Sequence, residues 1–266
     1  MYSFINTSAA PLDQAQGLRQ MFAATRQRFV PLVHNPHVAF GGVAMERLCA
    51  AFGDRQLTTL VVDAADTASA PHEVASVDLT ACIEPLSVRV SFLAARGLPM
   101  RWLDSRGATA GFLGALSEAA PRCDVVLVHA GASDLVRLFG GRAPRPLLLA
   151  SDQAESLTHA YASMKLLSQR LGVMAFDLLL ATRGSPARMT RIADRLASCA
   201  DRFLGAALGE WAVVDPTAAD SAPLDLALRR LTAAQIASSD ECIELRRPTS
   251  GPSTGSVTGA RLVYAN

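Results

Sequence analysis

Two adjacent glycines, Gly41 and Gly42, separate an apolar run that begins at residue 29 from a helical pattern that continues to residue 52. A strand, a glycine turn and a helix in this order can form a phosphate-binding loop, because glycines let backbone N–H groups approach the phosphates. That chemistry also requires a Lys that reaches the phosphate oxygens and a Ser or Thr hydroxyl that contacts Mg²⁺. The next residues, 43 to 46 (VAME), supply neither. The segment predicts the shape of a phosphate-binding loop without its reactive side chains.

The sequence AFGGVAME, residues 39 to 46, resembles GKGGVGKT, the form of this loop in the MinD/ParA family of ATPases. Phe40 and Met45 stand where that family has lysines, and Glu46 stands at the Ser/Thr position. A carboxylate there would face the triphosphate, and two like charges ~4 Å apart repel by roughly 4 kcal/mol near a protein surface. The resemblance therefore implies a degenerate nucleotide site. We expect that the chain binds neither ATP nor Mg²⁺ and does not hydrolyse ATP.

Two further positions resemble metal-handling parts of the same family. Asp63 follows a predicted strand over residues 57 to 62, where the family has an acidic residue after its second strand. The stretch RCDVVLVHAG resembles the family strand whose Asp holds a magnesium-bound water, and His129 takes that place. Neutral imidazole is a poor Mg²⁺ ligand, because Mg²⁺ prefers oxygen. From the residues alone, Asp63 is more simply a helix cap or loop group, and His129 is a polar strand end rather than a new catalytic base.

A third part of the resemblance concerns the base. In FDLLLATR, Ala181 stands where the family has the Asn that reads adenine. An alanine side chain has no amide with which to contact a base edge. Phosphate, metal and base recognition are thus all expected to be lost.

The N-terminal region contains the most specific short match. Apolar residues recur at steps of three and four over residues 11 to 28, which predicts an amphipathic helix. Within it, DQAQGLR matches DQAxxLR, the N-terminal motif of the FlhG (FleN) group of the MinD/ParA family. That resemblance implies docking on the GTPase FlhF and stimulation of its GTP hydrolysis. Spacing alone also allows a helix that packs on its own domain.

The same resemblance implies a role for each side chain of the motif. Gln14 would present a polar group to the nucleotide site of the partner, and Ala15 and Leu18 would anchor the helix. Asp13 and Arg19 would fix its orientation. These five residues form the predicted partner-binding site.

Composition excludes several classes of protein. The formal charge of the 266 residues is +1, so no broad basic surface indicates nucleic-acid binding. Five widely spaced cysteines are typical of reduced thiols, which predicts a cytoplasmic location. The resemblance to the FlhG (FleN) group implies recruitment to the cell pole through a partner. No signal peptide or membrane span is predicted. The spacing of His34 and His37 is too weak a pattern to predict a metal site, and we predict no catalytic residue.

The order of elements predicts the fold. Strand patterns at residues 57 to 62, 98 to 104, 122 to 131, 146 to 150 and 176 to 183 alternate with helical patterns. This favours an α/β fold, a mostly parallel, doubly wound sheet with helices on both faces, as in MinD-like proteins.

Three regions are predicted along the chain. They are an activator helix and leader (1–28), a MinD-like domain (29–247) that closes with a helix over residues 224 to 236, and a flexible tail (248–266). The tail lacks the basic, apolar pattern of a membrane-sensing helix, so we do not predict membrane association from it.

Together these features predict a non-hydrolysing FlhG-like regulator of flagellar number and placement. Its expected partners are an FlhF-like GTPase and a flagellar transcription regulator or basal-body component. Without the loop lysines we expect a monomer or a constitutive dimer rather than ATP-driven dimerisation. Two alternatives remain at this point: an active ATPase in which a lysine from elsewhere completes the site, and a partner-binding scaffold that does not stimulate a GTPase.

Overall fold

The computed structural model describes residues 27–142, 144–218 and 225–244. Its strands are β1 (Arg28–Val33), β2 (Thr59–Asp63), β3 (Glu84–Pro85), β4 (Val90–Ala94), β5 (Val125–Ala130), β6 (Leu147–Ala150), β7 (Ala175–Ala181) and β8 (Ala207–Val214). They form one eight-stranded sheet in the order β3-β4-β2-β5-β1-β6-β7-β8. Every neighbouring pair is parallel except β3 with β4. The predicted fold class is confirmed.

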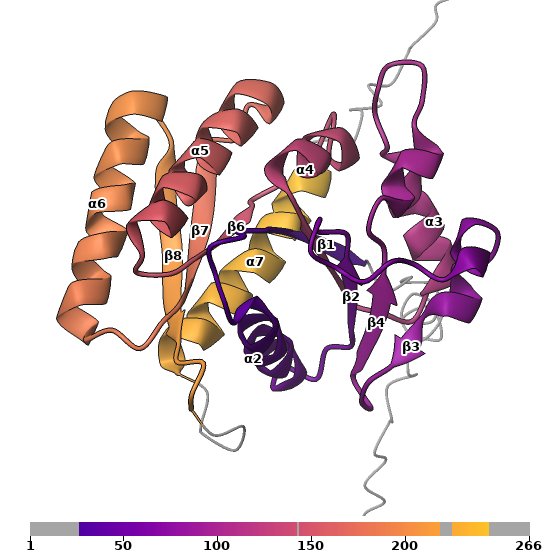
Figure 1. Cartoon of the computed structure of the whole chain (residues 1–266), viewed down its shortest axis with the longest axis horizontal. Coiled ribbons are helices and arrows are strands. Elements are labelled where there is room, and N and C mark those ends of the chain that lie inside the picture. Colours follow the sequence, from indigo (N-terminus) through magenta and orange to yellow (C-terminus); the bar gives the residue numbers. More distant parts are fainter. Residues whose placement is uncertain (1–26, 143, 219–224, 245–266) are drawn as a thin grey trace, which may run out of the picture.

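The α-helices of the described residues are α2 (Gly41–Gly53), α3 (Gly111–Ala119), α4 (Ala132–Leu138), α5 (Ala154–Leu171), α6 (Pro186–Leu204) and α7 (Leu226–Glu244). The short 3₁₀ helices are η1 (Glu73–Ser76), η2 (Thr80–Cys82) and η3 (Leu98–Trp102). Figure 1 shows these helices on both sides of the sheet, with α5 and α6 side by side at one end of the molecule.

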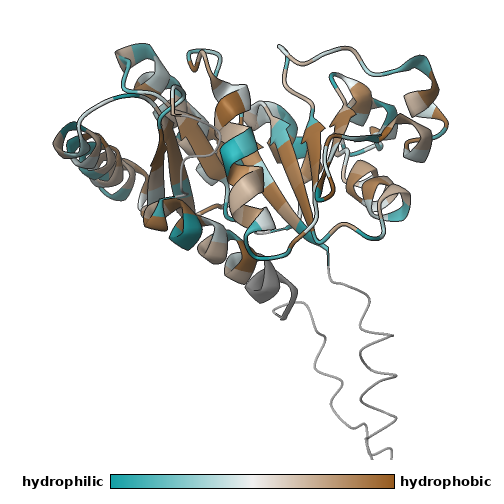
Figure 2. Cartoon of the chain, turned by 90° about the horizontal axis from the view of Figure 1, so that it is seen from below, coloured by the Kyte–Doolittle hydropathy of each residue, from teal (hydrophilic) through white to brown (hydrophobic). Residues whose placement is uncertain are grey.

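A separate apolar core lies on each face of the sheet because strand side chains alternate between the two faces. In β5, Val125 and Leu127 belong to the core under α2 and α7, whereas Val126 and Val128 belong to the core under α3 to α6. In Figure 2 the strands are predominantly brown, and teal residues concentrate on helices and loops. This two-faced burial explains why the central strands read as continuous apolar runs.

The strand predicted over residues 98 to 104 is wrong. The chain forms a strand earlier, at β4, and residues 98 to 102 form η3 instead. Gly97 has a φ of 70° and turns the chain, and Pro99 then lies in the first turn of η3. Proline suits that position because its missing N–H would have no partner there. The other predicted strands correspond to β2, β5, β6 and β7, and the closing helix to α7.

The N-terminal motif and the C-terminal tail lie outside the described residues. This applies to Asp13, Gln14, Ala15, Leu18 and Arg19, and to residues 248 to 266. Among the helices that the structure describes, none combines the length and the hydropathy needed to cross a lipid bilayer.

Candidate functional site

The predicted site residues gather at the carboxyl ends of the central strands. β5 lies between β1 and β2, and Asp63 in β2 is directly opposite His129 in β5. Phe40 precedes α2, and Ala181 is the last residue of β7. In open α/β sheets ligands bind at this edge, where loops from several strands meet. The sheet therefore brings residues far apart in the sequence to one region.

The loop between β1 and α2 differs from the turn predicted at Gly41 and Gly42. These glycines are the first two residues of α2, and the turns lie before them, at residues 36–37 and 39–40. The carbonyl of Phe40 accepts a hydrogen bond from the N–H of Ala44, so the helix is already formed at this point. The position predicted for the turn is therefore wrong. The loop itself contains no glycine and no residue with positive φ.

Asn35 holds this loop in place, and the sequence did not single it out. Its side chain is 2% exposed. Its Nδ2 donates to the carbonyl of Leu149 at 2.9 Å and to the carbonyl and Oγ of Ser156, both at 3.0 Å. Its Oδ1 accepts from the N–H of His37 at 3.1 Å. The amide ties the loop after β1 to β6 and α5. A lone Asn after an apolar strand was the only sequence signal.

Met45 and Glu46 lie in the second turn of α2. Met45 is half-buried against the core under α2 and α7, and Glu46 is exposed. Burial raises the pKa of the Cys49 thiol to about 12, and the charge of Glu46 adds to that effect. Glu46 is the sixth residue of α2, because the helix already begins at Gly41.

Asp63, His129 and His34 form a chain of side chains at the ends of β2, β5 and β1. His129 Nδ1 lies 2.8 Å from Asp63 Oδ1, and His129 Nε2 lies 3.2 Å from His34 Nδ1. His129 is buried. His34 extends this chain, whereas its spacing from His37 had suggested only a weak metal-ligand pattern. No group of three or more metal-binding side chains occurs within the described ranges.

Burial and hydrogen bonding shift these groups in a consistent way. Burial, with the nearby charge of His129, lowers the pKa of His34 from 6.5 to about 4. Burial alone would raise the pKa of Asp63, but the hydrogen bond and charge of His129 outweigh it and lower that pKa. An ionised Asp63 requires a proton on His129 Nδ1. When both imidazoles are neutral, His34 Nδ1 therefore donates to His129 Nε2.

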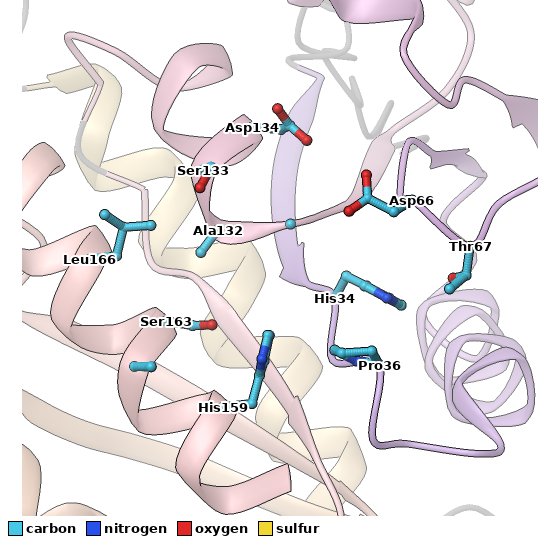
Figure 3. A pocket seen from close by; sticks show the side chains of 12 residues that line it. His34, Pro36, Asp66, Thr67, Ala132, Ser133, Asp134, His159, Ser163 and Leu166 are labelled. Atoms are coloured by element: carbon cyan, nitrogen blue, oxygen red, sulfur yellow. The ribbon is translucent and has the colours of Figure 1, made fainter. Parts of the chain in front are cut away.

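Several cavities open at this edge among the described residues, and two of them are lined by residues close to the predicted site. One, of about 370 Å³, is lined by His34, Asp66, Asp134 and His159 among others, and none of its lining residues is Lys or Arg. In Figure 3 the imidazole of His34 lies beside Asp66 and across the cavity from His159. Burial raises the pKa of Asp134, with a smaller opposing effect of Arg137. The lining of this cavity favours neutral or positively charged groups.

The second cavity, of about 460 Å³, is lined by Phe40 and Ala181 together with Arg183 and Arg188. Arg188 Nη2 lies 3.0 Å from a carboxylate oxygen of Asp152. Within this region the predicted residues divide. Phe40 and Ala181 line one cavity, Asp63 and His129 are linked through His34 to the other, and Met45 packs against the core.

Comparisons with known proteins agree with the fold. No protein-family model matches the chain. A segment of 101 residues is 36% identical to the antiactivator FleN of Pseudomonas aeruginosa, covering 37% of this chain and 36% of FleN. The similarity thus spans about a third of the length of that relative.

Solved structures extend the likeness of fold over most of the chain. The MinD cell division protein of Aquifex aeolicus has a TM-score of 0.51 at 10% identity, covering 83% of this chain and 98% of MinD. A putative plasmid partition protein of Borrelia burgdorferi bound to AMPPNP has a TM-score of 0.51 at 7% identity, covering 82% and 97%. The chain has the MinD/ParA fold, and the resemblance to the FlhG (FleN) group within that family is supported.

Proposed function

We propose that this chain is a non-hydrolysing, FlhG-like regulator of flagellar number and placement. The observation that carries the proposal is the 36% identity to the antiactivator FleN over 101 residues, on a body with the MinD/ParA fold. The DQAQGLR motif adds the partner: an FlhF-like GTPase whose GTP hydrolysis the motif stimulates. The role of FleN as an antiactivator favours a flagellar transcription regulator as a further partner, beside a basal-body component.

Several observations support the loss of nucleotide chemistry. The first turn of α2 contains only Gly, Val and Ala, so no Lys or Ser/Thr stands where a helix N-terminus would meet phosphate. The preceding loop has no glycine, so its backbone lacks the flexible N–H cradle of a phosphate-binding loop. The cavity beside His34 has carboxylates and no Lys or Arg. These residues do not fit a magnesium–nucleotide complex.

The proposed location follows from the same role. The protein acts in the cytoplasm and reaches the cell pole through its GTPase partner. Stimulation depends on Gln14, which presents its amide to the nucleotide site of the partner, while Asp13, Ala15, Leu18 and Arg19 hold the helix on its surface.

The activator role is tested by mixing the protein with FlhF and GTP and measuring phosphate release. We expect an increase in hydrolysis with the wild-type chain and loss of that increase with Gln14→Ala. Gln16→Ala is the matched control, because it removes the same side chain at a variable position of the motif. Equal hydrolysis with and without the wild-type chain would leave only a scaffold role.

The non-hydrolysing character is tested separately by isothermal titration calorimetry with ATP and Mg²⁺. We expect no binding at micromolar concentrations. Micromolar binding would support the alternative of an active ATPase. The plasmid partition protein of Borrelia burgdorferi, which shares the fold, is bound to AMPPNP.

A further inference from the structure

The cavity beside His34 has two polar groups without partners on its walls. Ser163 in α5 is 4% exposed, and its hydroxyl forms no hydrogen bond with any described residue. Figure 3 shows this hydroxyl directed into the cavity. Across the cavity, His34 Nε2 is buried and also lacks a partner within the described ranges. Buried polar groups are nearly always hydrogen-bonded, so two such groups on one cavity indicate a ligand that contacts both.

The contacts of His34 determine what it offers to a ligand. Asp63 accepts a hydrogen bond from His129 Nδ1, and with both imidazoles neutral His129 Nε2 accepts one from His34 Nδ1. His34 Nε2 therefore has a lone pair and no proton, and it can only accept. The hydroxyl of Ser163 can donate or accept. A ligand that satisfies both groups has an N–H or O–H donor at one end and a second polar group at the other.

The charged side chains in the cavity lining are both acidic. Asp66 and Asp134 line it, and no Lys or Arg does. Burial chiefly raises the pKa of Asp134, Arg137 opposes this, and repulsion by Asp66 adds to it, so the two carboxylates act on each other. Arg137 lies 3.3 Å from Asp134, whereas Asp66 forms no salt bridge with any described residue. A cation beside both carboxylates relieves their repulsion, and an anion such as phosphate increases it.

The size of the cavity and its remaining lining limit the ligand further. Its volume of about 370 Å³ is near the lower end of small-molecule sites, which span roughly 300–1,000 Å³. Ala132, Ala162 and Leu166 give it apolar walls. No residue of α2 or β7 lines it, so it is separate from the degenerate loop and from Ala181. These features favour a short aliphatic chain between the two polar ends.

We propose that this cavity binds a small aliphatic amine that has a hydroxyl or a second amine at its other end. The ammonium group donates to His34 Nε2 beside the two carboxylates, the carbon chain contacts Leu166, and the far end bonds to Ser163. The proposal uses no residue of the DQAQGLR motif and does not depend on the GTPase-activating role.

The test uses three probes that share a butane chain with a hydroxyl at one end. The other end is an ammonium in aminobutanol, a hydroxyl in butanediol and a carboxylate in hydroxybutyrate. NMR of the ¹⁵N-labelled histidine side chains of the full chain, in EDTA so that no metal ion contributes, should show aminobutanol shifting the Nε2 signal that His34→Gln removes. The signal of the exposed His72 should stay in place. The same titrations should rank aminobutanol at least about tenfold above butanediol, with no binding of hydroxybutyrate.

A double variant tests the two carboxylates. Asp66→Asn with Asp134→Asn should make aminobutanol and butanediol bind equally well. The matched control, Asp194→Asn with Asp201→Asn, removes two exposed carboxylates from α6 and should keep the preference for the amine. Circular dichroism melting confirms that each variant is folded.

Ser163→Ala tests the other end of the ligand. It should weaken aminobutanol about threefold and leave butylamine, which lacks the hydroxyl, unchanged. An Nε2 signal of His34 that does not move with aminobutanol, equal binding of amine and diol to the wild-type chain, or an amine preference that survives loss of both carboxylates would each overturn the proposal.

Discussion

Two carboxylates at opposite ends of the parallel strands, Asp63 half-buried and Asp177 fully buried, have pKa values shifted in opposite directions. Asp63, at the carboxyl end of β2, has a lowered pKa despite its burial, because His129 donates to it at 2.8 Å. Asp177, near the amino end of β7, has a raised pKa, because its complete burial outweighs the charge of Arg145. The same residue type on one sheet thus responds to different dominant causes.

The hydrogen bonds around the two groups show what each network does. Asp177 accepts from Arg145 Nη2 at 2.7 Å, from the N–H of Glu210 at 2.8 Å and from Gln235 Nε2 at 2.7 Å. These contacts join the start of β6, β7, β8 and α7. Asp63 belongs to a chain that ends at His34 Nε2, a buried nitrogen without a hydrogen-bond partner among the described residues. The network at the amino ends of the strands, here called the amino edge, stabilises the fold. The carboxyl ends, here called the carboxyl edge, keep polar groups beside their cavities.

The largest expected effect comes from breaking the network at the amino edge. Asp177→Ala leaves Arg145 and Gln235 without their shared acceptor, and removal of one partner of a buried pair is strongly destabilising. We expect a loss of about 3 kcal/mol in the free energy of unfolding, measured by urea denaturation. Asp201→Ala removes an exposed carboxylate on α6 and should change it by less than about 0.5 kcal/mol. Similar values for both variants would contradict a stabilising network.

A smaller effect is expected at the carboxyl edge from Asn35→Ala. This change removes the amide that ties the loop after β1 to Leu149 and Ser156, at a cost of about 2 kcal/mol in unfolding free energy. Asn35→Asp keeps the size of the side chain but replaces its donor with a charge that faces a carbonyl oxygen. It should therefore cost at least as much in the same denaturation experiment. A neutral Asn35→Asp would show that the loop is held by other contacts.

The sequence could predict the parts of the fold that depend on continuous burial. β5 is buried at all six positions, and its first four residues are all apolar. β4 was missed because only one of its five residues is buried and Ser91 interrupts its pattern. Hydrophobic periodicity reveals buried faces, and this strand near the edge of the sheet has few buried side chains.

The contacts of the candidate site were less accessible to sequence reasoning. Asp63 and His129 were each placed at a strand end, but their pairing depends on the strand order, which brings β2 beside β5. Asp177 had a recognisable signal, an acid inside an apolar strand, yet its partners lie 32 and 58 residues away. Gly41 and Gly42 suggested a turn, whereas the side chain of Asn35 sets the turns earlier in the loop. Tertiary hydrogen bonds decided these positions.

The smallest expected effect is the change in unfolding free energy with pH. His34 at the carboxyl edge and Asp177 at the amino edge contribute to it with opposite signs. The pKa of His34 in the folded state, about 4, lies below its ordinary value of 6.5, so acidification protonates the unfolded state first. This contribution lowers the free energy of unfolding as pH falls through that window. For the raised pKa of Asp177 the folded state takes up the proton first, so its contribution rises as pH falls through that raised value toward the ordinary 3.8.

Urea denaturation between about pH 7 and pH 5 measures these contributions. Because the ring of His34 is only half-buried, solvent screening reduces its part to about 1 kcal/mol at the lower pH. His34→Gln should flatten the loss of stability on acidification. Asp177→Asn removes a contribution of opposite sign, so it should make the loss steeper once the pH is below the raised pKa of Asp177. If His34→Gln left the slope unchanged, the proton equilibrium at the carboxyl edge would belong to another group. The contrast between the two edges would then rest on hydrogen bonding alone.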